Sequence, residues 1–127
     1  MSDQGGHQYL KSHELSGDVL QLDLVSEQRQ VLEAAAATAA GHTAKTLIKD
    51  GPLRVVLLGL TQGAVMREHK AEGPVTIQTL SGKARVSSAD ETDELAAGSM
   101  IVFGGGVPHS VEAQTDSVLL LTIAIAG

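Results

Sequence analysis

Two histidines stand in glycine-framed segments that could each deliver a side chain to one site. His69 ends the stretch GAVMREH, which begins at Gly63, and His109 ends the stretch GSMIVFGGGVPH, which begins at Gly98. An imidazole can bind a divalent metal or transfer a proton near neutral pH. Either histidine alone is a weak signal, because a histidine beside a turn can simply bond to backbone carbonyls. The occurrence of both segments in one chain favours a functional site.

A basic residue is expected beside the first histidine. In an extended run over residues 65–71, alternate side chains share a face, so Arg67 is predicted to point the same way as His69. A guanidinium and two imidazoles facing an apolar interior favour a small carboxylate or another anionic metabolite. We therefore predict His69, His109 and Arg67 as ligand-binding residues, with His69 and His109 as the ligands of any bound metal.

Both segments resemble, in degenerate form, the two motifs of the small single-domain cupins of the RmlC-like type. The positions that match the motifs are Gly63, His69, Gly82, Gly98, Gly106 and His109. The departures are Ala71 for the second histidine, Val75 for the glutamate, Gly104 for the proline and Ala113 for the final asparagine. The resemblance covers roughly residues 44–125 and implies a double-stranded β-helix, or jelly-roll barrel. In such a barrel we expect His69 and His109 to lie on neighbouring strands, with a cavity between them that opens at the end where residues 104–108 turn.

Metal-binding cupins usually supply three histidines and one carboxylate, so the resemblance implies that two of the four ligand positions remain here. We expect a metal-poor pocket, with any divalent transition metal bound at well below one equivalent. The preferred function is therefore binding of a small metabolite in the barrel. Two alternatives stay open: a metal-dependent dioxygenase or isomerase that uses His69 and His109, and a metal-free acid–base enzyme.

The composition of the chain argues against several classes of partner and site. The 127 residues suit one domain, and the net charge of -6 argues against nucleic acid and anionic membrane surfaces as partners. The only aromatic residues are Tyr9 and Phe103, so few side chains could bind a sugar or a base by stacking. There is no cysteine and no apolar run long enough to span a membrane. We expect a soluble, cytoplasmic protein.

The chain divides into a polar segment, residues 1–17, which is expected to be disordered, and one cupin domain over residues 18–127. Strong helix formers over residues 26–40 predict one N-terminal helix, with Ser26 as its N-cap and Gly41 as its stop. After Gly41, turn signals recur at short intervals. They predict strands over 44–49, 53–60, 64–71, 75–80, 83–88, 92–95, 99–103, 109–113 and 117–125, an all-β fold.

Two further features follow from this pattern. The runs LRVVLLGL and SVLLLTIAIA are apolar on both alternating faces, which predicts cover by the barrel core on one side and by the helix or a second subunit on the other. A homodimer is expected on this ground. The acidic run of Asp90, Glu91, Asp93 and Glu94 forms an expected hairpin tip, which is interpreted as solvated, with attraction of a cation as the alternative.

Overall fold

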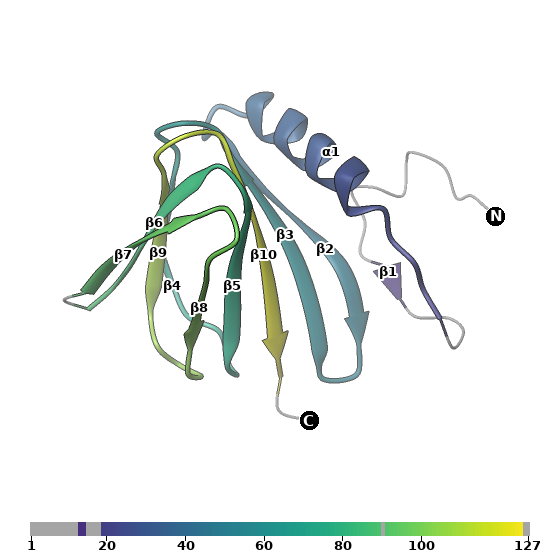
Figure 1. Ribbon diagram of the computed structural model, residues 1–127. Helices are drawn as coiled ribbons and strands as arrows, with labels where there is room; N and C mark the ends of the chain where they lie inside the picture. Colours follow the sequence, from purple (N-terminus) through teal and green to yellow (C-terminus); the bar gives the residue numbers. More distant parts are fainter. Residues whose placement is uncertain (1–12, 15–18, 90, 126–127) are drawn as a thin grey trace.

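Two facing β-sheets with one helix outside them make up the fold (Figure 1). The computed structural model describes residues 13–14, 19–89 and 91–125, with His13, Glu14 and His69 described by their backbone. The elements are β1 (His13–Glu14), α1 (Leu24–Ala36), β2 (His42–Asp50), β3 (Leu53–Leu60), β4 (Val65–His69), β5 (Val75–Ser81), β6 (Lys83–Ser88), β7 (Glu91–Ala96), β8 (Met100–Phe103), β9 (His109–Ala113) and β10 (Ser117–Ala124).

The strands follow a jelly-roll order. One sheet runs β1-β2-β3-β10-β5-β8 and the other runs β4-β9-β6-β7, with neighbours antiparallel except for the pair β1 and β2. All nine strands predicted from the sequence are present as β2 to β10, and their bounds differ from the expected ones by at most two residues. The predicted all-β class with one helix is confirmed. No helix in the described part of the chain has the length and apolarity to cross a membrane.

The two-faced apolar strands are covered twice, as their sequence predicts. Leu58 of β3 and Leu119 of β10 lie in the core between the sheets. Leu57 and Val118, their neighbours in the chain, lie in a second apolar cluster with Val31 of α1. Because alternate side chains of a strand point to opposite faces, one strand can serve both clusters. The helix therefore covers the outer face of the larger sheet.

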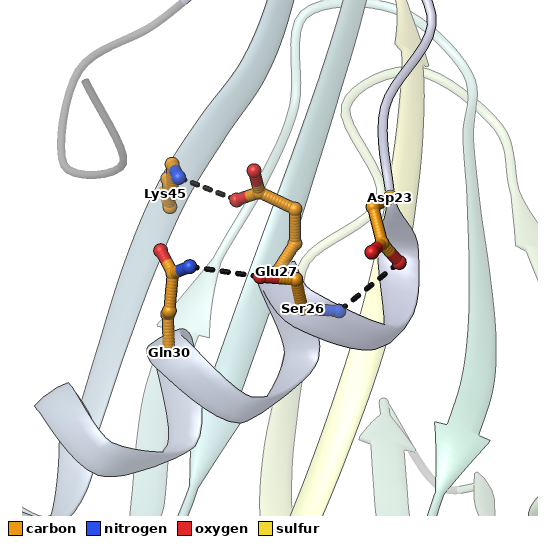
Figure 2. A network of polar contacts seen from close by, with 5 residues as sticks. All are labelled: Asp23, Ser26, Glu27, Gln30 and Lys45. Carbon is orange, nitrogen blue, oxygen red and sulfur yellow. Dashed lines mark hydrogen bonds and ion pairs between the residues drawn. The ribbon is translucent and has the colours of Figure 1, made fainter. Parts of the chain in front are cut away.

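The helix begins earlier than expected and has a different cap. Asp23 is the N-cap, and its Oδ1 accepts hydrogen bonds from the backbone N–H groups of Val25 and Ser26 at 3.1 and 3.3 Å. Figure 2 shows the bond with Ser26. The prediction of Ser26 as the cap was wrong, because Ser26 lies in the first turn, where its hydroxyl accepts from Gln30. The helix ends at Ala36, short of the expected residue 40.

An ion pair is buried beneath the helix. Lys45 of β2 and Glu27 of α1 are bonded through Nζ and Oε1, and their side chains are 2% and 5% exposed (Figure 2). Removing either charge would leave the other in a poorly solvated interior, which costs far more than a surface pair contributes. The pair therefore fixes the position of α1 on the sheet.

The segment expected to be disordered contains one short strand. His13 and Glu14 form β1, which pairs in parallel with Ile48 and Lys49 at the edge of the larger sheet. Backbone pairing at a sheet edge requires no apolar periodicity, so this strand could not be read from the sequence. The expectation for residues 1–17 as a whole stays a prediction. The rest of the segment up to residue 17 lies outside the described residues.

Candidate functional site

The two motif histidines meet across one strand pair. His69 at the end of β4 and His109 at the start of β9 are direct partners in the antiparallel register. Residues far apart in the sequence are thus neighbours at one end of the smaller sheet. This confirms for the backbone the expectation that the two histidines lie on neighbouring strands, while their roles as ligands stay predictions.

His109 is packed rather than exposed to solvent. It is 1% exposed, and its ring stacks on that of Phe103 with the centroids 4.9 Å apart and the planes inclined by 3°. Its Nδ1 lies 3.2 Å from the carbonyl oxygen of Val107. A carbonyl only accepts hydrogen bonds, so this contact favours the tautomer with the proton on Nδ1. The ring is therefore held in one orientation by the turn that precedes β9.

That turn is bonded to the end of β6 and to the segment between β4 and β5. The hydroxyl of Ser88 donates to the carbonyl of Pro108 at 2.7 Å, and the N–H of Gly106 donates to the carbonyl of Ala71 at 2.8 Å. Gly106 has a φ of +79°, a conformation that glycine adopts without the strain a side chain would bring. The loop of glycines is thus a structural turn that places His109.

The alternation expected between Arg67 and His69 is interrupted in β4. The register of β4 against β9 shifts between Met66 and His69, so three steps along β4 correspond to two along β9. Such an irregularity breaks the rule that residues two apart share a face. Met66 packs against the core, and the next residue, Arg67, is exposed. The placement of Arg67 beside His69 thus loses its basis, and its role in ligand binding stays a prediction.

The residues at the other family ligand positions do not fit a metal. Ala71 packs against the core between the sheets, and Val75 is 2% exposed within that core. Neither side chain carries an atom that can coordinate a cation. Within the described residues, no three side chains of His, Asp or Glu come together as a metal-binding group. Of the four family ligand positions, the two occupied by Ala71 and Val75 therefore supply no donor.

A cavity of about 520 Å³ opens between the two sheets at their free edges, where β7 and β8 face each other without pairing. Its walls combine apolar side chains with a few polar groups: Val86, Ser88, Ala89, Glu91, Asp93, Ile101, Val102, Phe103 and Val107. The volume is in the range of small-molecule sites. Phe103 is a lining residue, whereas the stacked His109 is not.

The cavity differs from the site predicted from the sequence. A space lined by both histidines was expected at the end where residues 104–108 turn. The cavity does reach that turn at Val107, but its other walls come from β6, β7 and β8. Its carboxylates, Glu91 and Asp93, belong to the run interpreted as a solvated tip. Counting back in twos from the buried Leu95 would have placed both on the inner face.

The comparisons with known proteins identify the fold. No protein family profile and no curated protein sequence matches the chain. Among solved structures, a conserved protein of unknown function from Streptococcus pyogenes aligns with a TM-score of 0.68 and 24% identity, over 87% of this chain and 91% of that one. An RmlC-like cupin from Desulfovibrio desulfuricans aligns with a TM-score of 0.61 and 24% identity, over 65% and 81%.

An enzyme is also among the similar structures. The salicylate 1,2-dioxygenase of Pseudaminobacter salicylatoxidans aligns with a TM-score of 0.69 and 23% identity over 78% of this chain. The alignment covers 33% of the dioxygenase, so the similarity concerns one part of that larger protein. At these identities the similarity shows the barrel, and it does not carry over a reaction.

Proposed function

Since the chain has the fold of the RmlC-like cupins, we propose that it binds a small metabolite in the cavity between β7 and β8. The observation that carries the proposal is the cavity itself: about 520 Å³ between the free edges of the sheets, with apolar walls and a few polar groups. Val86 and Ile101 extend the barrel core into its wall. A ligand there would bury apolar surface against side chains that are already ordered.

Phe103 gives the cavity its one aromatic wall. The ring is fixed from behind by the stacked imidazole of His109, which is in turn oriented by the Val107 carbonyl. A wall held in one conformation loses little rotamer freedom when a ligand binds, and this favours affinity. In this proposal His109 positions the aromatic wall.

A metal-dependent reaction is the second candidate, and one observation favours it: His69 and His109 are register partners. The hydrocarbon side chains of Ala71 and Val75 at the remaining family positions weigh against it. A metal-free reaction with His109 as acid or base is the third candidate. It requires access to an imidazole that is 1% exposed. Metabolite binding needs neither condition, so it is the function supported best.

A cavity-blocking variant tests the proposal. Val107 is 37% exposed and lines the cavity, so Val107→Trp should fill it without disturbing the core. Val65 is 50% exposed on β4 and does not line it, so Val65→Trp is the matched control. Each protein is dialysed against a cell metabolite extract, and the retained compounds are measured by mass spectrometry.

The wild type and Val65→Trp should retain the same compound, and Val107→Trp should lose it while keeping its circular dichroism spectrum. Retention of that compound by a folded Val107→Trp would place the ligand elsewhere. Failure of the wild type to enrich any metabolite would contradict the binding function.

A further inference from the structure

The charged side chains of the cavity are both acidic. Glu91 and Asp93 of β7 line it, and among the lining residues there is no Lys or Arg. The register explains their direction: Glu91 pairs with Ser88, Asp93 with Val86, and Leu95 with Ala84. Leu95, Ala84 and Val86 are buried in the core between the sheets. Because paired residues share a face, the two acidic residues lie on the inner face of the sheet, at its open edge, where both are exposed to solvent.

On the opposite face of the same strands, acidic side chains form ion pairs with an arginine. Glu94 lies 3.5 Å from Arg85, and Arg85 lies 3.6 Å from Glu112. The hydrogen bond from Gln114 and the neighbouring Arg85 lower the pKa of Glu94. By contrast, within the described part of the chain neither Glu91 nor Asp93 has an ion pair or a side-chain hydrogen bond. The inner carboxylates therefore lack the cation that their outer neighbour has.

We infer that the ligand of this cavity is an organic cation, a protonated amine attached to an apolar body, and not the anion expected from Arg67. This inference rests on the proposed binding function and names its ligand class. The apolar body would lie against Ile101 and Phe103, and the ammonium group would lie between Glu91 and Asp93. An ammonium beside carboxylates gains charge-assisted hydrogen bonds that a neutral or anionic group cannot make.

Inward charges on an edge strand also have a structural use, because they discourage another strand from pairing with that edge. Protection of the edge works with charges of either sign, and it does not depend on which side chains line the cavity. Here the two charges have the same sign and border an apolar cavity. Two like charges at one cavity raise its affinity for a cation, which a purely protective role would not require.

Three probes of similar size but different charge test the inference: 2-phenylethylamine, 2-phenylethanol and 3-phenylpropanoate. Each is titrated into the whole chain labelled with ¹⁵N, and the amide shifts of Ser88, Ile101 and Val107 report binding at the cavity. The amine should bind about five- to tenfold more tightly than the alcohol, as two partly exposed ion pairs would give. The propanoate should bind most weakly.

The double variant Glu91→Gln with Asp93→Asn should reduce amine binding to the level of the alcohol and leave alcohol binding unchanged. Glu94→Gln, on the outer face of the same strand, is the matched control and should leave the preference intact. If the alcohol or the propanoate binds as tightly as the amine, the inference is overturned and the binding function stands. If no probe shifts these amides, the inference and the proposed function both fall.

Discussion

Phe103 and His109 stack with their planes 3° apart, and one of the two rings lines the cavity while the other is buried. The pair joins the edge strand β8 of the larger sheet to the first residue of β9 in the smaller one. The imidazole thus contributes to the cavity through the ring it supports. In this arrangement His109 has a structural role, support of the Phe103 ring, whereas the motif implies a role as a ligand.

Replacing Phe103 by Ala should lower the free energy of unfolding by about 2 kcal/mol, less than a fully buried phenylalanine costs, because this ring is half-buried. It should also open His109 to diethylpyrocarbonate, as read by peptide mass spectrometry. Urea denaturation gives the stability change. Phe103→Leu keeps most of the bulk and should protect His109 better. Equal protection of His109 in the wild type and the alanine variant would contradict the role of the ring as its cover.

The buried pair of Lys45 and Glu27 predicts a large effect from a single substitution. Lys45→Met should lower the free energy of unfolding by about 3 kcal/mol, because it leaves the Glu27 carboxylate buried without its main counter-charge. Adding Glu27→Gln should recover more than half of the loss. Urea denaturation of the two single variants and the double variant forms a complete cycle. Additive losses in the double variant would show that the two charges are not coupled.

Close packing of the helix on β3 depends on one glycine. A Cβ added at Gly59 would lie 2.7 Å from the carbonyl oxygen of Val31 in α1. Gly59→Ala should therefore push the helix away and lower the free energy of unfolding by about 1–3 kcal/mol. Gly104→Ala is the control, because an added Cβ there meets no atom within 4 Å. Similar midpoints of urea denaturation for Gly59→Ala and Gly104→Ala would mean that the helix can move without loss of stability.

Metal content after purification without added salts should be well below one equivalent. The physical reason is that Ala71 and Val75 place hydrocarbon where related barrels place donors. Elemental analysis by plasma mass spectrometry measures it directly. A stoichiometric transition metal that is lost in both His69→Ala and His109→Ala would instead support the metal-dependent alternative.

Most of the fold was predictable because its strands alternate and its turns are marked by glycine. Cover of both faces of β3 and β10 followed from the same pattern. The choice of cap was harder, since Asp23 and Ser26 are equally good N-cap residues, and the start of the helix depends on where its apolar face meets the sheet. The pairing of β1 with β2 is a backbone pairing, and such pairing leaves no apolar signal in the sequence.

The candidate site was only partly predictable, for two physical reasons. The irregularity in β4 after Met66 depends on pairing with β9, so alternation alone cannot place Arg67 relative to His69. The cavity forms where β7 and β8 do not pair with each other. The position of both strands at sheet edges depends on the order of the sheets and cannot be read from either strand alone. Local patterns therefore predicted that His69 and His109 lie on neighbouring strands. They did not predict Phe103, Glu91 and Asp93 as residues around the cavity.

A homodimer remains the expected state of the protein in solution, and the structure suggests the face that would form it. The helix covers β2 and β3, whereas the edge strand β8 exposes Met100 by 54% and Val102, which also borders the cavity, by 62%. Beside them in register are Gln78 and Thr76 of β5, which carry no net charge. An edge strand with exposed apolar side chains is stabilised when a second copy covers it.

Light scattering coupled to size-exclusion chromatography should therefore give twice the chain mass of 13.1 kDa at micromolar concentration. The double variant Met100→Lys with Val102→Lys should reduce it to a single chain, because two buried ammonium groups would oppose association. Val65→Lys places the same charge on the other sheet at a residue that is 50% exposed, and this control should stay dimeric. A wild-type mass of one chain would rule the dimer out, and dissociation of the control alone would move the interface to the smaller sheet.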